Sequence, residues 1–290
     1  MKIALCGAAG LLGSTLGPFL SLHGHDVMTH SRGQGAQHRA DLSDVTAAYE
    51  LLNKISPDCI ANLVGLTDVD RCEREPNQAY LTNVRTVENI ASWIRQRQMP
   101  CHLIHISTDQ VYDSTQIHNE DQVTLTGYYA ISKYAGELAA ASVPSTILRT
   151  NFVGRSRCAK RTSLTDWLFS SLSSKTPIQV FDDVLFSPLA ISTLSEMIEL
   201  SIRNKPIGVF NLGSHNGMSK ADFAFAFADR LGLSNSAMTR TTTVNATQLK
   251  AYRPKDMRMD SAKFERTLGI KLPRLIDEIE RVTEEYRENG

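Results

Sequence analysis

Short apolar runs alternate with longer amphipathic stretches along the first half of the chain, and this pattern predicts strands followed by helices. Five runs have the length and composition of strands: residues 2–6, 26–30, 58–64, 102–106 and 145–149. The stretches between them place apolar residues three or four positions apart, as on one face of a helix. Strands that alternate with helices predict a parallel sheet with right-handed crossovers and helices on both faces.

The alternation is looser after Thr150, although single elements are still predicted there. Helices are expected at about 163–174 and 192–204, and strands at 178–181 and 209–212. Ser219 is placed to cap a further helix that stops at Gly232, and Pro273 to open the last one.

The predicted fold class is therefore α/β, in two parts. Residues 1–150 are expected to form a Rossmann-type doubly wound parallel sheet, and about 176–205 to join it. Residues 151–175 and 206–290 are expected to form a smaller C-terminal α/β lobe.

A glycine-rich segment, Gly7-Ala-Ala-Gly10-Leu-Leu-Gly13, lies between the first predicted strand and the first predicted helix. In this context Gly7 allows a tight turn, Gly10 lets the backbone approach a pyrophosphate, and Gly13 lets the helix pack on the strand. The helix N-terminus then offers free N–H groups and a positive dipole end to phosphate groups. A flexible Gly-Ala loop is the alternative, but the flanking strand and helix favour dinucleotide binding. The first part is therefore expected to bind NAD(P), and the C-terminal lobe to bind the substrate.

The end of the second predicted strand bears on which dinucleotide binds. An acidic residue there would bind the ribose diol of NAD, but this chain has Ser31 and Arg32. These side chains suit the 2′-phosphate of NADP, so NADPH is the expected cofactor, with NADH possible. Asp41 precedes a helix capped by Ser43 or Asp44, and it either faces the adenine or helps that cap.

Tyr129 and Lys133 are the candidate proton-transfer pair. They are four residues apart in Tyr-Ala-Ile-Ser-Lys, so a helix places them one turn apart on the same face. A nearby ammonium favours the phenolate and lowers the pKa of a phenol from about 10, which suits proton transfer near neutrality. Thr108, at the end of a predicted strand, is placed to hold the oxygen that receives the proton. The alternative is that Tyr129 is a half-buried helix residue and Lys133 a solvated lysine. The glycine motif and the strand before Thr108 favour the proton-transfer pair over that alternative.

Composition and charge narrow the range of partners. Lys+Arg and Asp+Glu both number 31, which leaves no net charge to attract nucleic acid or an anionic membrane. Glycines interrupt the apolar N-terminus, so we interpret it as structure rather than a signal peptide, and no run is long enough to span a bilayer. The five cysteines are scattered and odd in number, which favours reduced thiols and a cytoplasmic protein. No metal site is predicted, and a homodimer is possible.

Several motifs together resemble one enzyme family. They are GAAGLLG, NLVGLTDVDRCEREP, ISTDQVY, YAISK with AGE, ILRTNFVG and RPKDMRMDSAKFERTLGIKLP. They resemble the extended short-chain dehydrogenase/reductases and, within these, the dTDP-4-dehydrorhamnose reductase (sugar-nucleotide-binding) group, over essentially the whole chain. The glycine motif and YxxxK are typical of the superfamily. Asp68-Val-Asp70 to Glu73, Ser107-Thr-Asp109 and Arg253-Pro254 are typical of the subgroup.

The resemblance implies NAD(P)H-dependent reduction of a 4-keto-6-deoxy nucleotide sugar, with dTDP-4-dehydro-L-rhamnose as the leading candidate. Tyr129 would protonate the sugar oxygen, Lys133 would bind the nicotinamide ribose, and Thr108 would hydrogen-bond the carbonyl. Arg253 belongs to the nucleotide-sugar side by the same matching, with a surface arginine as the alternative. The implied cofactor contacts are Gly7, Gly10, Leu11, Leu12, Gly13, Ser31, Arg32, Asp41, Leu42, Asn62, Val64, Gly65, Tyr129 and Lys133, and the implied substrate contacts are Gln110, Phe152 and Arg253.

Departures from the family pattern fall where the sugar is expected. Gln110 and Phe152 replace an aromatic residue and a tryptophan, and Ile117-His118 replaces Pro-Tyr. Two other classes also remain open. A nucleotide-sugar epimerase or dehydratase would use the same core but recycle bound NAD. A non-catalytic NADP-binding regulatory subunit, resembling that of methionine adenosyltransferase, would consume no cofactor.

Overall fold

The computed structural model describes residues 1–159, 161–247 and 249–287, and the chain divides into two compact units. Thr108, Tyr129 and Lys133 lie in the first unit, whereas Gln110 and Arg253 lie in the second. The functional division into a cofactor-binding domain and a substrate lobe remains a prediction. The first unit comprises Met1–Thr108, Gly127–Arg149 and Ser195–Phe210, and the second comprises Asp109–Thr126, Thr150–Leu194 and Asn211–Gly290.

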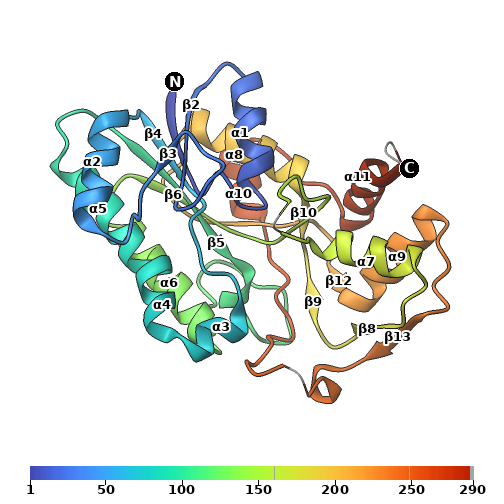
Figure 1. The fold of residues 1–290 in the computed structure, drawn as a ribbon. Coiled ribbons are helices and arrows are strands. Elements are labelled where there is room, and N and C mark those ends of the chain that lie inside the picture. Colours follow the sequence, from blue (N-terminus) through green and yellow to red (C-terminus); the bar gives the residue numbers. More distant parts are fainter. Residues whose placement is uncertain (160, 248, 288–290) are drawn as a thin grey trace. The chain divides into compact units, whose positions relative to one another are not determined.

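A seven-stranded sheet forms the centre of the first unit, with the strand order β11-β6-β5-β4-β1-β2-β3 (Figure 1). The central strand β1 pairs in parallel with both β2 and β4. The chain first adds β2 and β3 on one side of β1 and then adds β4, β5, β6 and β11 on its other side. The direction of winding therefore reverses between β1 and β4. Ligands of such sheets bind beyond the carboxyl ends of the strands at this reversal. The strands are β1 (Lys2–Cys6), β2 (Asp26–Ser31), β3 (His38–Arg39), β4 (Cys59–Asn62), β5 (His102–Thr108), β6 (Ser145–Thr150) and β11 (Gly208–Leu212).

Helices cover both faces of this sheet (Figure 1). Helices α2 (Val45–Ile55), α5 (Thr86–Gln96) and α6 (Tyr128–Ala140) lie along one face, and α1 (Gly13–Leu22) and α8 (Ile191–Asn204) along the other. The core under α2 and α5 includes the fully buried side chains of Leu52, Ile60, Ile90 and Leu103. The predicted Rossmann-type α/β sheet is confirmed.

A π-helical turn interrupts the helical segment that runs from Pro76 to Gln96. After the short helix α3 (Val69–Arg74), α4 (Pro76–Tyr80) continues into the π turn η1 (Leu81–Arg85) and then into α5. One extra residue in a helix leaves the apolar spacing almost unchanged, so periodicity did not reveal it. Strand β4 ends at Asn62 rather than at 64, because the Asn62 side chain accepts the Val64 N–H at 3.2 Å and turns the chain.

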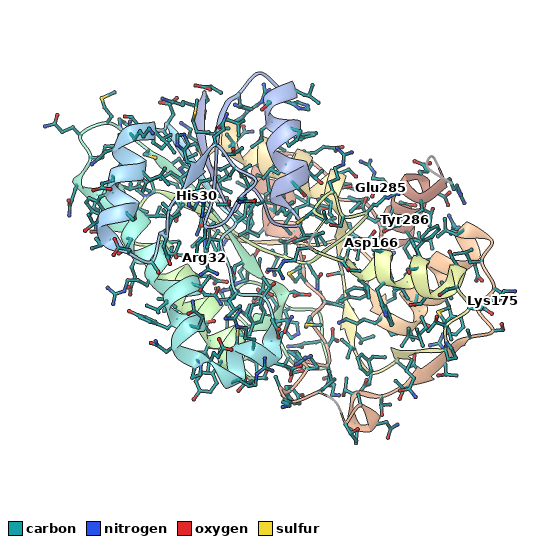
Figure 2. The ribbon with its side chains drawn as sticks, viewed as in Figure 1. His30, Arg32, Asp166, Lys175, Glu285 and Tyr286 are labelled. Atoms are coloured by element: carbon teal, nitrogen blue, oxygen red, sulfur yellow. The ribbon has the colours of Figure 1, made fainter. Side chains whose placement is uncertain are left out.

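Short strand pairs and helices make up the second unit. The fully buried rings of Phe223 and Phe227 form the centre of its core, and Tyr286 packs edge-on against Phe227. The Tyr286 hydroxyl donates a hydrogen bond to Asp166 Oδ1 at 2.7 Å (Figure 2). The helices and turns are η2 (Asp109–Val111), α7 (Leu164–Ser173), α9 (Lys220–Leu231), η3 (Thr243–Asn245), α10 (Ala262–Leu268) and α11 (Leu275–Arg287), and the strand pairs are β7 (Phe152–Val153) with β10 (Leu189–Ala190), β9 (Leu185–Phe186) with β12 (Met218–Ser219), and β8 (Ile178–Phe181) with β13 (Met238–Thr241).

The predicted limits of helices in this unit are mostly confirmed. The Ser219 side chain caps α9 by accepting the Asp222 N–H, and Gly232 ends the helix with a φ of 66°. Helix α11 begins at Leu275, two residues after the proline expected to open it. Strand β13 was not predicted, because its sequence Met-Thr-Arg-Thr has neither an apolar run nor flanking turn residues.

The predictions of reduced cysteines and of no membrane-spanning segment can be compared with the structure. All five cysteines are free thiols, and burial raises the pKa of Cys6 to about 12 and that of Cys101 to about 11. Such thiols are unreactive. Across the described ranges, none of the helices is long and apolar enough to cross a membrane.

Gly136 allows α6 to lie directly against the π turn. A Cβ atom built at this position would lie 2.3 Å from the backbone oxygen of Asn83, far inside normal contact distance. Any larger residue would therefore push α6 away from η1. Because α6 carries Tyr129 and Lys133, the position of that pair depends on this glycine.

Replacing Gly136 by alanine should lower the free energy of unfolding by about 1–3 kcal/mol, because overpacking outweighs the roughly 1 kcal/mol that alanine adds to helix propensity. Urea denaturation followed by circular dichroism measures the change. Gly33→Ala is the matched control, since a Cβ there meets nothing within 4 Å. Equal midpoints for the two variants would contradict the close helix contact.

Candidate active site

The glycine turn after β1 has the geometry that a dinucleotide phosphate requires. Gly7 has a φ of 90°, and its N–H and that of Ala8 both donate to the His30 oxygen at 2.9 Å. A Cβ at Gly13 would lie 2.5 Å from the Gly7 oxygen, so glycine alone lets α1 start this close to the turn. No side chain caps α1 and no acidic residue stands in its first turn, so the positive end of its dipole is left for an anion.

The end of β2 carries the two residues expected at a 2′-phosphate. Arg32 is exposed (Figure 2). The Ser31 hydroxyl turns back to donate to the Gly33 oxygen at 2.7 Å. Asp41 accepts hydrogen bonds from the Ser43 hydroxyl at 2.7 Å and the Ser43 N–H at 3.0 Å. These bonds, helped by the Arg32 charge, hold the pKa of Asp41 below its usual value.

The N-terminus of α2 shows which residue caps the helix, but it does not test the contact of Asp41 with adenine. Asp44, rather than Ser43, caps α2 by accepting the Ala47 N–H at 2.8 Å. Asp41 orders the turn before that cap, and its contact with adenine remains a prediction. Leu12 and Leu42 are buried, at 5% and 3% exposure, and their contact with a cofactor remains a prediction.

Asn62 and His105 form a buried pair at the centre of the sheet. The Asn62 Oδ1 accepts the Val64 N–H, which orients the amide so that its Nδ2 donates to His105 Nδ1 at 3.2 Å. His105 therefore carries its proton on Nε2, and burial holds its pKa well below the usual value, with the Lys133 charge acting in the same direction. The imidazole is neutral, so Lys133 is the cation at this point.

Thr108, Tyr129 and Lys133 are brought together by β5 and α6. Thr108 is the last residue of β5, and the Lys133 Nζ donates to the oxygen of Ile106 in the same strand at 2.6 Å. The three predicted residues are buried, at 4–6% exposure, with Tyr129 and Lys133 one turn apart on α6. A Cβ at Gly65 would lie 3.9 Å from the Lys133 Nζ, so the loop after β4 also reaches this point.

Burial makes Lys133 an unusual lysine. Withdrawal from solvent lowers its pKa to about 8, and the Glu137 charge opposes that shift. A lysine with this pKa exchanges its proton near neutral pH, which is a property of groups at functional sites.

Asn83, on the π turn, braces α6 against the loop after β4. Its Oδ1 accepts the Leu66 N–H at 2.7 Å, and its Nδ2 donates to the Ser132 hydroxyl at 2.9 Å. That hydroxyl donates to the Tyr129 oxygen at 2.9 Å. Asn83 is only 1% exposed, so its side chain makes these bonds inside the fold rather than at the surface.

A buried ion pair next to Lys133 was missed by the sequence analysis. Glu137, one turn beyond Lys133 on α6, accepts a bidentate pair of bonds from Arg149 of β6, with 2.7 Å from Nη2 to Oε2. The Ser107 hydroxyl also donates to Glu137. These bonds fasten α6 to β5 and β6. The spacing of Tyr129, Lys133 and Glu137 was a usable signal, because residues at i, i+4 and i+8 share one helix face.

The predicted substrate residues lie in the second unit. Gln110 is in the turn η2, Phe152 begins β7, and Arg253 lies in the loop before α10; all three are partly exposed. Their contact with a sugar remains a prediction. His118 has a different part: its ring is 1% exposed, stacks on Tyr112 at 4.8 Å, and hydrogen-bonds the Asp256 oxygen, so it is a packing residue.

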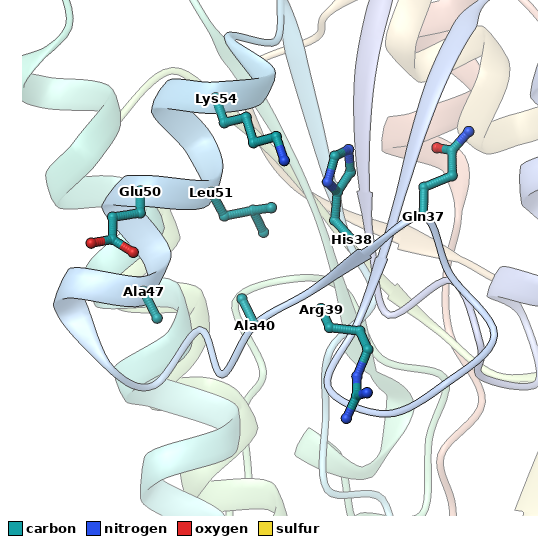
Figure 3. Close-up of a pocket in the computed structure, with 8 residues that line it drawn as sticks. All are labelled: Gln37, His38, Arg39, Ala40, Ala47, Glu50, Leu51 and Lys54. Atoms are coloured by element: carbon teal, nitrogen blue, oxygen red, sulfur yellow. The ribbon is translucent and has the colours of Figure 1, made fainter.

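A separate pocket of about 330 Å³ lies at the edge of the sheet (Figure 3). It is lined by the β3 segment, including His38 and Arg39, and by Glu50, Leu51 and Lys54 of α2. None of the residues predicted for cofactor, substrate or catalysis lines it.

The chain resembles a set of known proteins over nearly its full length. A family model described as the RmlD substrate binding domain matches residues 1–288. The chain is 27% identical over 296 residues to the probable low-salt glycan biosynthesis reductase of Haloferax volcanii, covering 96% of each protein. It is 29% identical over 292 residues to the dTDP-4-dehydrorhamnose reductase of Shigella flexneri, covering 94% of each. The structure of the dTDP-4-dehydrorhamnose reductase of Bacillus anthracis in complex with NADP matches with a TM-score of 0.88 at 22% identity, over 98% of this chain and 99% of that one.

Glu137→Gln should lower the free energy of unfolding by about 3–5 kcal/mol, because it leaves the Arg149 charge buried without a carboxylate. Urea denaturation of the purified protein measures the loss. Glu75→Gln is the control, since the Arg71–Glu75 pair is about half exposed, at 42% and 44%, and such pairs contribute about 0–1 kcal/mol. A similar loss in both variants would show that the buried pair does not anchor α6.

Proposed function

This chain belongs to the RmlD substrate-binding domain family, and from that membership we propose that it is an NADPH-dependent oxidoreductase that reduces the keto group of a nucleotide sugar. The expected substrate is a 4-keto-6-deoxy nucleotide sugar, with dTDP-4-dehydro-L-rhamnose as the leading candidate. Relatives named as reductases, including one that acts in glycan biosynthesis, support this assignment.

The observation that supports catalysis most directly is the placement of Tyr129 and Lys133. Both are buried on one face of α6, and the Lys133 ammonium is fixed to β5, whose last residue is Thr108. A surface tyrosine and a solvated lysine would need none of these contacts. The arrangement suits Tyr129 as a proton donor and the Thr108 hydroxyl as a hydrogen-bond donor at a strand end, where parallel sheets bind ligands.

Two features of the first unit support NADPH as the cofactor. A Cβ at Gly7 or Gly13 would crowd the backbone, at 3.0 Å from the Leu63 carbonyl carbon and 2.5 Å from the Gly7 oxygen, and the uncapped N-terminus of α1 would suit the pyrophosphate. Arg32 at the end of β2 offers a guanidinium for a 2′-phosphate. Reduced nicotinamide, when bound, supplies a hydride to the carbonyl carbon.

The residues of the chain then handle the oxygen and its proton. Thr108 donates a hydrogen bond to the carbonyl oxygen, and Tyr129 gives that oxygen its phenolic proton as the C=O bond becomes a C–OH group. The nearby Lys133 charge stabilises the phenolate that remains. Lys133 would also bind the ribose next to the nicotinamide, and the Glu137 charge helps to keep Lys133 protonated by raising its pKa.

A reductase assay with the full chain tests the function. We expect NADPH to be consumed stoichiometrically with a 4-keto-6-deoxy nucleotide sugar, and Tyr129→Phe to lower kcat by at least about a hundredfold because phenylalanine has no proton to give. NADPH affinity should stay near that of the unmodified protein, since the ring is kept.

Tyr128→Phe, on the exposed neighbour of Tyr129, is the control and should keep full activity. Nucleotide sugars are compared with the same sugars lacking the nucleotide, by following reduced cofactor at 340 nm. Full activity of Tyr129→Phe would show that a group other than Tyr129 donates the proton. Turnover without net NADPH consumption would point to an epimerase or dehydratase, and would overturn the reductase assignment.

Cofactor choice gives a second test. Arg32→Ala should weaken NADPH binding by about ten- to a hundredfold and leave NADH binding nearly unchanged, because one charge-assisted contact is worth about 1.5–3 kcal/mol. Fluorescence titration of the reduced cofactors measures both constants. Arg39→Ala, an exposed arginine on the edge strand, controls for loss of general positive charge. Equal binding of NADPH and NADH by the unmodified protein would contradict the role of Arg32.

A further inference from the structure

Helix α6 begins without a cap from its own N-terminal residue. Its N-cap is Gly127, which has no side chain to accept the free N–H groups of the first turn. Helix ends fray more readily than helix centres. Tyr129 is the second residue of this helix, so the candidate proton donor lies in the turn that most needs a cap.

The cap comes instead from a residue far away in the sequence. The carboxylate of Glu73, on α3, accepts the Tyr128 N–H at 2.8 Å. Among the residues that the structure describes, Glu73 takes part in no other hydrogen bond or ion pair through its side chain. A negative charge at this place also matches the positive end of the α6 dipole. Glu73 therefore caps α6 from another helix.

Gly127 makes room for this carboxylate. Its φ of −173° and ψ of 170° are those of extended backbone, which any residue adopts, so the turn itself does not require glycine. A Cβ atom at this position would lie 2.6 Å from Glu73 Oε1, closer than such atoms normally approach. A larger residue would displace the carboxylate from the cap. The glycine is thus explained by Glu73 rather than by backbone conformation.

The helix that carries Glu73 also packs against the candidate proton donor. Cys72, its neighbour in α3, is fully buried in a small cluster that contains Ala79 and Tyr129. Two adjacent residues of α3 therefore act on the start of α6. One packs in the same cluster as the Tyr129 side chain, and the other binds the backbone of the residue before it.

We propose that Glu73 is a positioning residue for the reaction, an inference that rests on the proposed function. By fixing the first turn of α6, it holds the Tyr129 phenol where the carbonyl oxygen receives its proton. Lys133 and Gly136 secure the helix further along, and Glu73 secures its start. Proton transfer needs hydrogen-bonding distance, and a displacement of about 1 Å can lower the rate by about a hundredfold.

Glu73→Ala in the full chain removes the cap. With NADPH and dTDP-4-dehydro-L-rhamnose, kcat should fall about ten- to a hundredfold, because Tyr129 is no longer held in place. The dissociation constant of NADPH and the KM for the sugar should stay near those of the unmodified protein. Glu73→Gln keeps a side-chain oxygen that accepts the same N–H, so it should retain most of the activity.

Gly127→Ala tests the same bond from the other side. Its methyl group should displace the carboxylate and lower both kcat and the thermal midpoint, as Glu73→Ala does. Combining the two substitutions should cause little further loss, because each removes the same hydrogen bond. Asp44→Ala is the matched control. It removes the cap of α2, where Asp44 accepts the Ala47 N–H at 2.8 Å, and should lower the thermal midpoint without changing kcat.

Unchanged kcat in Glu73→Ala would overturn the positioning role. Additive losses for Glu73→Ala and Gly127→Ala would show that they share no bond, and would overturn the cap itself. An equal fall of kcat in Asp44→Ala would assign the effect to general loss of stability. Each of these results would leave the reductase function standing. No turnover of a 4-keto nucleotide sugar by the unmodified protein would refute the proposed function and this role together.

Discussion

The close attachment of α6 to the carboxyl end of β5 is the constraint on which the candidate site depends. Gly136 lets the helix approach the π turn, where a Cβ would lie 2.3 Å from the Asn83 oxygen. The Lys133 ammonium and the Glu137 carboxylate then bond to β5, and Glu137 to β6 as well. Tyr129 lies on the same helix, so these contacts help to fix its position.

The same attachment sets the electrostatics of the site. Lys133, Glu137 and Arg149 are all withdrawn from water. The Glu137 carboxylate forms an ion pair with Arg149, and its charge also raises the pKa of Lys133. The opposite charges of Glu137 and Arg149 cancel each other, so the Lys133 ammonium is the net positive charge that remains beside Tyr129. His105 adds none, because its amide partner and its burial keep it neutral. A buried cation with a pKa of about 8 is costly for folding, and the site keeps it where a phenolate would form.

Buried charge is paired in both units. In the first unit the buried acid and base lie within hydrogen-bonding distance of each other. In the second unit the core is aromatic, built around Phe223 and Phe227, and the buried Asp256 carboxylate pairs with Arg258 at 2.6 Å.

The sequence by itself determined the features that depend on local geometry. The spacing of Tyr129 and Lys133, the glycine turn before α1, the cap at Ser219 and the order of strands and helices all follow from backbone periods and from turn residues a few positions apart. Only the tertiary structure decided which distant groups meet. Nothing near Glu137 in the sequence indicates Arg149 of another strand as its partner, and His118 gives no sign that it packs on Tyr112. The π turn at Leu81–Arg85 is hidden for a related reason. It carries Asn83, whose Nδ2 donates to the Ser132 hydroxyl at 2.9 Å, and that distance is set by how two helices pack rather than by either helix alone.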